Sequence, residues 1–186
     1  MQTLALTIDD RRALLSLARQ AIAAHLAQGP APPQPARITL RGYGAFVSLH
    51  AEGQLRGCIG YPQSDRPLTE VVAHCAVAAA SQDPRFSPVT PAELPTIDLE
   101  ISVLGPIRPV KSVQEIDVGR HGLIVSQGFS RGLLLPQVAT EYGWDRETFL
   151  EHTCLKAGLR RDAWRAGAQI QQFEAEVFSE ADVADA

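Results

Sequence analysis

The sequence predicts an α+β fold in which a mostly antiparallel sheet packs against separate helices. Two alternating segments, 44–50 and 54–60, are separated by a short turn that contains glycine, which is typical of a β-hairpin. Residues 97–104 alternate between apolar and polar side chains, so they form a strand with one buried face. The remaining helical segments stand apart from strands that mostly pair with their neighbours, which argues against a doubly wound sheet.

The first half of the chain contains two predicted helices. The first begins after Thr7, a suitable N-terminal cap, and is stopped by Gly29 and the proline that follows it. Its buried side is formed by apolar residues at helical spacing: Leu15, Ala18, Ile22 and Leu26. Residues 30–36 form an extended, proline-rich connection. The second helix is predicted from Pro67 to Ser81, with Cys75 in the core.

The second half repeats this mixture of strands and helices. A turn over 83–88 and a short helical turn after Thr90 precede strand 97–104. The later elements follow in chain order: strands 122–126 and 132–135 joined by a loop at 127–131, helices 136–142 and 145–157, and a strand at 172–178. Cys154 is expected in the core of the last helix, and residues 180–186 are expected to be frayed.

The register of the hairpin can be argued from its pattern, since a shift of one residue exchanges every facing partner. A three-residue turn with Gly53 in the left-handed conformation would set Val47 and Leu49 opposite Gly57 and Leu55. This register gives one consistently apolar face. A two-residue turn would mix apolar with charged partners, so the three-residue turn is preferred.

Arg56 and Cys58 share the other face of this strand. An arginine seldom points into a dry core without a partner, so this face is interpreted as a groove or a surface. A thiol about 7 Å from a guanidinium is prone to higher reactivity. Gly57 and Gly60 would let a second backbone or a ligand approach closely, or mark a bulge. The alternative is that Cys58 is a small buried strand residue.

Other residues could complete a site around this thiol. A cysteine nucleophile needs a base, and His121, near glycines at a strand end, is the candidate, with a simple turn histidine as the alternative. Glu100, on the polar face of strand 97–104, is a candidate carboxylate for the same groove. Arg85 lies in a turn closed by prolines and is a candidate binding residue, with a local structural bridge to Asp83 as the alternative. Lys156 lies near a helix C-terminus, where a cation is favoured in any case.

Composition narrows the functional classes. The 186 residues suit one domain, ordered over about 8–180, or two small lobes sharing a chain, and the formal net charge of −4 gives no general affinity for nucleic acid. DNA binding is therefore not expected. The three cysteines lack CxxC spacing, which predicts neither a disulfide framework nor a metal site. No signal peptide and no membrane span are evident, so a cytoplasmic location is expected.

The string Leu55–Gly60 resembles the signature motif of the AMMECR-one domain family, the A component of the AmmeMemoRadiSam (Amme–Memo–radical-SAM) gene triplet. Further segments agree, in the right order, over residues 8–180: 83–86, 100–104, 119–124, 133–139, and 156–159 with Trp164. The hallmark motif shows no departure, while the connection at 30–36 is a local variation.

The resemblance implies two unequal lobes flanking a cleft near the motif, and it implies a Memo-like and a radical-SAM protein as partners. It supplies neither a reaction nor a cofactor. The residues expected to bind a ligand are Arg56, Gly57, Gly60, Arg85, Glu100, Gln137 and Lys156. One hypothesis is a small-molecule or nucleotide-like ligand in the cleft, with RNA modification among the roles proposed for the family and catalysis through Cys58 left open. The other is a non-catalytic adaptor that docks a Memo-like or radical-SAM protein. Direct binding of RNA through a local arginine-lined cleft is a further alternative.

Overall fold

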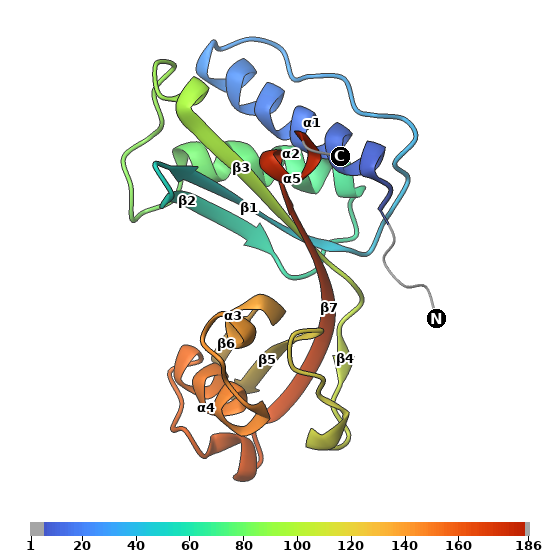
Figure 1. Ribbon diagram of the computed structural model, residues 1–186, viewed down its shortest axis with the longest axis vertical. Coiled ribbons are helices and arrows are strands. Elements are labelled where there is room, and N and C mark those ends of the chain that lie inside the picture. Colours follow the sequence, from blue (N-terminus) through green and yellow to red (C-terminus); the bar gives the residue numbers. More distant parts are fainter. Residues whose placement is uncertain (1–5, 185–186) are drawn as a thin grey trace. The chain divides into compact units, whose positions relative to one another are not determined.

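Every strand pair whose register the structure gives is antiparallel, and the helices alternate irregularly with these strands, so the predicted α+β class is confirmed. The computed structural model describes residues 6–184. These residues divide into two compact units of unequal size (Figure 1). The first takes the described residues up to Leu104 and those from Glu176 onward, and the second takes Gly105–Ala175.

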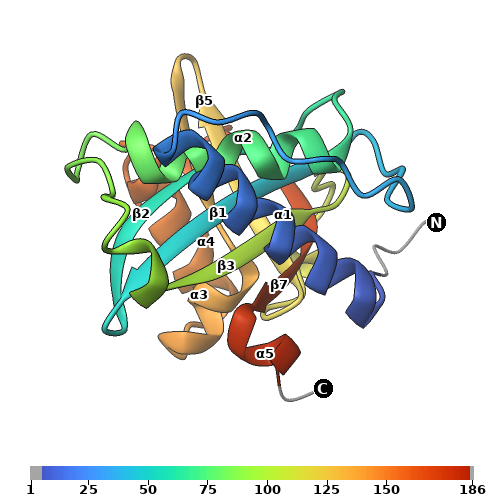
Figure 2. The ribbon, with the colours of Figure 1, turned by 90° about the horizontal axis from the view of Figure 1, so that it is seen from above.

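The first unit has a layer of helices on a layer of strands. Its elements are α1 (Ile8–Leu26), β1 (Gly44–Ala51), β2 (Gln54–Tyr61), α2 (Leu68–Ser81), β3 (Ile97–Leu104) and α5 (Glu180–Ala184). Figures 1 and 2 both show α1 and α2 lying over one face of the three strands. The opposite face of these strands therefore faces away from both helices.

The first helix begins where the sequence predicts. Thr7 caps it, because the Thr7 hydroxyl accepts a hydrogen bond from the Asp10 N–H at 3.2 Å. The Asp10 carboxylate in turn accepts from the Thr7 N–H at 3.1 Å, which completes a capping box. These contacts satisfy N–H groups that the first turn of a helix leaves without partners.

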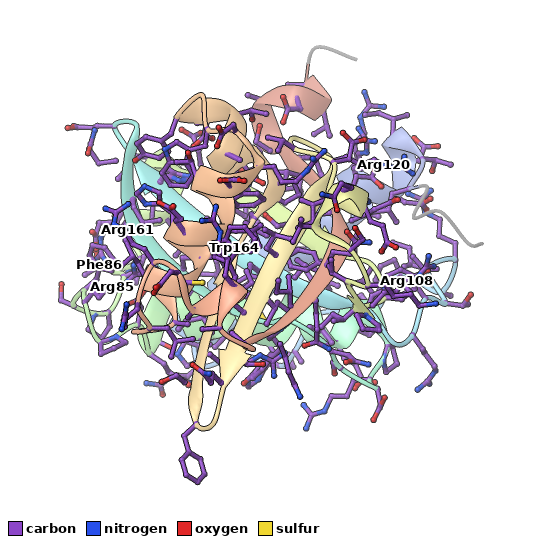
Figure 3. The ribbon with its side chains drawn as sticks, turned by 90° about the horizontal axis from the view of Figure 1, so that it is seen from below. Arg85, Phe86, Arg108, Arg120, Arg161 and Trp164 are labelled. Carbon is purple, nitrogen blue, oxygen red and sulfur yellow. The ribbon has the colours of Figure 1, made fainter. Side chains whose placement is uncertain are left out.

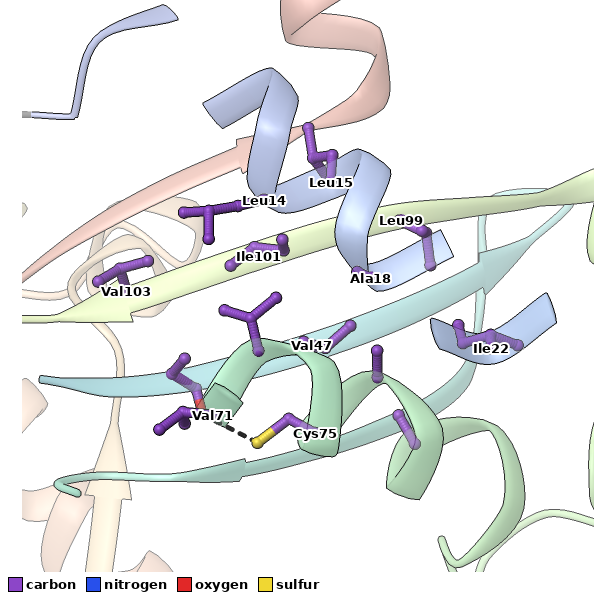
Figure 4. Packing of buried hydrophobic residues seen from close by; sticks show 14 of the residues in the cluster. Leu14, Leu15, Ala18, Ile22, Val47, Val71, Cys75, Leu99, Ile101 and Val103 are labelled. Carbon is purple, nitrogen blue, oxygen red and sulfur yellow. Dashed lines mark hydrogen bonds between the residues drawn. The ribbon is translucent and has the colours of Figure 1, made fainter. Parts of the chain in front are cut away.

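The core of the first unit lies between the helices and the strands. Figure 4 shows Leu14, Ala18 and Ile22 of α1 facing Val47 and Leu99 on the strands, and these five side chains are fully buried. The alternation of β1 and β3 brings apolar side chains to this face at every second residue. The core is therefore continuous from the first helix to the sheet.

Cys75 belongs to this core, as predicted. It is fully buried, and its thiol lies 3.7 Å from the carbonyl oxygen of Ala45, to which it donates (Figure 4). Burial raises the pKa of Cys75 to about 12, because the thiolate would lose its hydration. This thiol is therefore kept protonated and is unsuited to act as a nucleophile.

The second unit contains the remaining elements: β4 (Arg108–Pro109), β5 (His121–Gln127), β6 (Ser130–Leu134), α3 (Pro136–Glu141), α4 (Arg146–Lys156) and most of β7 (Gln169–Ser179). Asp145 caps α4 by accepting from the Thr148 N–H at 2.8 Å, as the sequence predicts. The predicted core position of Cys154 is confirmed, because its side chain is fully buried. The strand order over both units is β2-β1-β3-β7-β5-β6, with β4 paired to β7.

Three sequence predictions about local structure are wrong. The loop between β5 and β6 is a two-residue turn, Gly128–Phe129, because Gln127 already pairs with Ser130. Strand β7 begins at Gln169, three residues before the predicted strand. Of the residues expected to be frayed, 180–184 form α5, since Arg19 of α1 binds the Glu180 carboxylate, and 185–186 lie outside the described residues. That ion pair is a long-range contact that local pattern does not reveal.

The predicted register of the β1–β2 hairpin is also wrong. Glu52 and Gly53, both with positive φ (52° and 74°), form a two-residue turn. A bulge then adds Arg56 to β2, so that Leu49 pairs with Gly57. Because Arg56 is an extra residue, Gly57 points to the apolar face and Cys58 to the opposite face, as predicted. Their partners on β1 differ from the predicted ones. Leu55, placed on the apolar face by the sequence, is instead paired with His50 and exposed.

No helix within residues 6–184 is long and apolar enough to cross a membrane.

Candidate functional site

Strand β2, which carries the Leu55–Gly60 motif, is an edge strand of the sheet. An edge strand exposes unpaired N–H and C=O groups, which proteins commonly cover. Here the segment that follows α2, residues 83–93, supplies side chains to the outer edge of β2. The motif is therefore held between β1 on one side and this segment on the other.

Asp83 is the main contact between this segment and the strand. Its carboxylate accepts a hydrogen bond from the Cys58 N–H at 2.9 Å and two from the Arg85 guanidinium, at 3.0 and 2.7 Å. The Asp83 side chain is 2% exposed, whereas that of Arg85 is 55% exposed. The Arg85 hydrogen bonds, and then the Cys58 N–H, hold the pKa of Asp83 well below its usual range. The carboxylate is therefore ionised and fixed against the motif backbone.

Arg85 and Phe86 extend this contact toward solvent. The guanidinium carbon of Arg85 lies 5.4 Å from the centroid of the Phe86 ring, and Figure 3 shows the two side chains beside each other. A second, longer hydrogen bond of 3.5 Å runs from Arg85 to the Cys58 carbonyl oxygen. Both backbone polar groups of Cys58 are thus met by the 83–86 turn.

Arg56 makes the second contact with the segment. Its guanidinium donates to the Glu93 carboxylate at 3.1 Å and to the Ser87 carbonyl oxygen at 2.9 Å. The Arg56 side chain is only 17% exposed. Hydrogen bonds from Thr90, followed by that from Arg56, lower the pKa of Glu93 to about 2. The bulge at Arg56 turns its side chain along the edge of β2, so it lies against residues 87–93 and its charge is balanced there.

Cys58 itself faces away from the helices and is partly exposed. Its sulfur accepts a hydrogen bond from the Ser48 hydroxyl at 3.3 Å. The Cys58 N–H points away from β1, toward Asp83. Ser48 and Cys58 therefore form a non-hydrogen-bonded pair of the antiparallel ladder, the type of pair in which facing side chains lie closest. Ser48 pairs on its other side with Glu100 of β3. A thiol, a hydroxyl and a carboxylate therefore form one row across three strands.

The two glycines of the motif face filled space. A Cβ at Gly57 would lie 2.3 Å from the carbonyl oxygen of Ala79, so this glycine lets the backbone of α2 approach the strand. A Cβ at Gly60 would lie 2.3 Å from the ring of Phe46. Both glycines thus permit close approach, as the sequence predicts, and the groups that approach are parts of this unit.

The other predicted site residues belong to the second unit. His121 begins β5, and its Nδ1 accepts a hydrogen bond from the Asp117 N–H at 3.0 Å. In a neutral imidazole the other nitrogen, Nε2, then carries the proton and acts as a donor. Lys156 is exposed in the last turn of α4. Gln137, at the start of α3, has a buried Oε1 for which the structure gives no hydrogen-bond partner.

The structure thus brings together Arg56, Cys58, Arg85 and Glu100 on one unit and leaves His121, Gln137 and Lys156 on the other. Sequence reasoning did not identify Ser48, Asp83 and Glu93 as contacts of the motif. Ser48 was missed because the predicted register placed it opposite Arg56. The turn 83–88 places an acid two residues before an arginine, but no local pattern links Asp83 to the backbone of Cys58, which lies 25 residues earlier. Within residues 6–184, no three His, Cys, Asp or Glu side chains gather closely enough to hold a metal ion.

The fold and the motif define an α+β protein whose glycine-containing edge strand is covered by an Asp-Pro-Arg-Phe turn. The AMMECR1 family model matches residues 15–178, and the chain belongs to this family, which is the one that the sequence resembles. A protein from Thermofilum pendens is 46% identical over 94% of this chain and 92% of its own length. One from Methanothermobacter thermautotrophicus is 44% identical over 94% of this chain and 96% of its own length.

A solved structure agrees with this assignment. The crystal structure of an uncharacterized protein from Pyrococcus horikoshii matches with a TM-score of 0.81 and 40% sequence identity. The match covers 90% of this chain and 89% of that one.

Proposed function

We propose that this protein binds an uncharged small molecule on the sheet face that carries Cys58. The observation that supports this most is the Cys58 thiol, which is partly exposed and hydrogen-bonded to Ser48, while a buried carboxylate fixes its backbone. Burying an ionised carboxylate is costly unless it is well paired. Here the Asp83 carboxylate fixes the backbone of Cys58 before any ligand binds. Such preorganisation increases affinity, because less conformational entropy is lost on binding.

The charges of the surrounding groups favour an uncharged ligand. Arg56 is bonded to Glu93, and Arg85 to Asp83. The charge of each guanidinium is balanced by its carboxylate partner, so neither arginine offers an anion an uncompensated positive charge. The Glu100 carboxylate in the same row as Cys58 and Ser48 further disfavours an anion. The thiol and hydroxyl groups of that row suit hydrogen bonds to carbonyl, amide or hydroxyl groups of a ligand. In this proposal the two arginines position the motif, and the ligand contacts Cys58 and Ser48.

The proposal concerns binding rather than thiol catalysis. The hydrogen-bond partners given for Cys58 are Ser48, Asp83 and Arg85, and none of them is a base suited to deprotonate a thiol. His121 presents Nε2–H in its neutral form, which does not accept the proton of a thiol. If Cys58 were an activated nucleophile, its alkylation at neutral pH would be clearly faster than that of a free thiol. We expect no such acceleration.

Selective thiol labelling tests the accessibility on which the proposal depends. Iodoacetamide added to the native protein is expected to form a single adduct at Cys58, detected by mass spectrometry of the intact chain and its peptides. Cys75 and Cys154 are fully buried and serve as internal controls that react only after unfolding. An unreacted Cys58 in the native protein would count against a ligand site at this face.

Binding itself can be tested with disulfide fragments exchanged onto Cys58 under partly reducing conditions. We expect a few uncharged fragments to resist reduction more strongly than anionic fragments, because they gain contacts with the face. Ser48→Ala should reduce this retention, whereas the control Ser126→Ala in the second unit should not. Equal retention of all fragments would mean that the face contributes no binding energy.

A second candidate function, an adaptor for the Memo-like or radical-SAM partners that the family resemblance implies, is favoured by one observation. Phe129, in the two-residue turn between β5 and β6, is fully exposed. An aromatic side chain on a rigid tip is a suitable anchor for a partner's pocket. Co-purification with those two proteins should be lost in Phe129→Ser and kept in the control Tyr142→Ser, whose ring is also exposed. Equal behaviour of both variants would argue against this surface.

A further inference from the structure

A hollow lies on the opposite side of β2 from Cys58. Side chains alternate along the strand, so Cys58 and Gly60 face away from the helices while Ile59 and Tyr61 face toward them. At Tyr61 the strand ends, and the chain crosses to the start of α2. A hollow of about 380 Å³ opens there, within the size range of small-molecule sites. Its lining residues are Tyr61, Gln63, Ser64, Arg66, Val71 and His74.

One wall of this hollow is a pair of rings. Tyr61 and His74 stack with their centroids 5.8 Å apart and their planes at 26°. The Tyr61 hydroxyl is also hydrogen-bonded to His74 Nε2 at 3.1 Å. Each ring thus restrains the other, although both side chains are exposed. Val71, buried in the core of the first unit, adds an apolar surface. A fixed aromatic wall beside an apolar side chain suits a planar ring.

The other wall carries a positive charge. Arg66 is the one lining residue with a formal charge, and its side chain is exposed. Within residues 6–184 the structure gives its guanidinium no carboxylate within 4.0 Å and no hydrogen bond, in contrast to Arg56 and Arg85. Its backbone N–H is bonded to the Ser64 hydroxyl at 3.2 Å, which folds the loop beneath it. The adjacent Asp65 does not line the hollow.

From these two walls we infer that the hollow binds a small planar ring that bears one anionic group. The ring lies against Tyr61, and the carboxylate or phosphate is held by the guanidinium of Arg66, whose fork of donors matches either group. Gln63 and Ser64 offer further hydrogen bonds at the rim. This site is separate from the Cys58 face, and it requires no contribution from the second unit.

The experiment uses four probes on the full chain, followed by NMR of backbone amides or by calorimetry. AMP and benzoate combine a ring with an anion, adenosine has the ring alone, and inorganic phosphate has the anion alone. We expect AMP and benzoate to shift amides between Tyr61 and His74 with dissociation constants below about 5 mM, and to bind more tightly than adenosine or phosphate. Absence of binding by both ring anions at that concentration would overturn the inference.

Matched variants separate the two walls. Arg66→Gln should weaken AMP about tenfold and leave adenosine unchanged, since one charge-assisted contact is lost. The control Arg131→Gln should change nothing, because Arg131 is another exposed arginine whose side chain has no ion pair or hydrogen bond among residues 6–184. Tyr61→Leu keeps an apolar side chain and should weaken both AMP and adenosine. Equal effects of Arg66→Gln and Arg131→Gln, or phosphate binding as tightly as AMP, would refute the proposed geometry. Prior alkylation of Cys58 should leave AMP binding intact, which distinguishes this site from the one on the opposite face.

Discussion

Replacing Asp83 with asparagine is the sharpest test of how the motif is held. The carboxylate accepts four hydrogen bonds: one from the Cys58 N–H and three from the backbone and guanidinium of Arg85. Asparagine has nearly the same shape but keeps one oxygen. Its amide nitrogen would take the place of Oδ1 or Oδ2, and each of these oxygens accepts from Arg85. In either orientation of the amide, two of the four N–H donors that now reach the carboxylate would face the NH₂ group, which is itself a donor.

The size of the effect follows from burial. Asp83 is almost fully buried, so water cannot replace its lost hydrogen bonds, whereas Arg85 is more than half exposed and can be rehydrated. Leaving a buried donor without an acceptor costs about 1–3 kcal/mol, more when a charged partner is involved. We therefore expect Asp83→Asn to lower the free energy of unfolding by about 2–3 kcal/mol. For a chain of this length that corresponds to a decrease in melting temperature of roughly 4–12 °C.

The matched control is Asp162→Asn. Asp162 also pairs with an arginine two positions away, Arg160, but both side chains are exposed (57% and 86%). Such a pair contributes at most about 1 kcal/mol. Thermal or urea unfolding of the two variants, with hydrogen exchange of the Cys58 amide as a local measurement, compares a buried with an exposed pair of the same composition. A loss of stability no larger in Asp83→Asn than in Asp162→Asn would refute the reasoning.

The pH dependence of the free energy of unfolding gives an independent test of the role of Asp83. The pKa of Asp83 is lowered in the folded state from its ordinary value of 3.8, mainly by Arg85. The stabilisation from this ionised carboxylate is therefore fully present above that ordinary value and is lost as the pH falls through the folded pKa. The stability difference between the native protein and Asp83→Asn should be constant near neutral pH and shrink below about pH 4. A difference that is unchanged at pH 3 would mean that the charge of Asp83 does not stabilise the fold.

Two further substitutions test the packing around the motif and the C-terminus. Gly57→Ala should lower the free energy of unfolding by about 2 kcal/mol or more, since its Cβ would meet the backbone of Ala79. Gly29→Ala should be close to neutral in urea unfolding, because its Cβ would lie 3.7 Å from the Ala24 carbonyl oxygen, an ordinary contact distance. Glu180→Gln should weaken the contact of α5 with Arg19 and raise the hydrogen-exchange rate of the α5 amides several-fold. Unchanged exchange would show that this ion pair does not hold the helix in place.

The elements with strong local signals could be predicted from the sequence. Strand β3 was placed at its observed bounds, because its apolar and polar residues alternate without interruption. The Thr7 cap followed from the preference of threonine for the N-cap position, and the buried positions of Cys75 and Cys154 followed from helical spacing. Local pattern could not give the register of the hairpin. The turn is one residue shorter than predicted and the bulge adds one residue to β2, so the residues beyond the bulge keep their predicted faces but have different partners.

The candidate site was harder to predict because its contacts join segments distant in the chain. Arg56 and Cys58 were expected to act together on one groove. In the structure Arg56 is bonded to Glu93, 37 residues later, and the Cys58 backbone to Asp83, 25 residues later. The sequence contains each partner, but nothing in its periodicity links them. The edge position of β2 is the missing information, because only an edge strand needs such a cover.

This arrangement decides which variants can report on function. Substituting Arg56, Gly57 or Asp83 disturbs the edge cover or the contact with α2, so a loss of activity in a cell would reflect lowered stability as readily as a lost ligand contact. Cys58 and Ser48 present only their side chains to the open face, and Cys58→Ser with Ser48→Ala changes few buried atoms there. A defect in those two variants at unchanged melting temperature is therefore the evidence that would connect the motif with a ligand rather than with the fold.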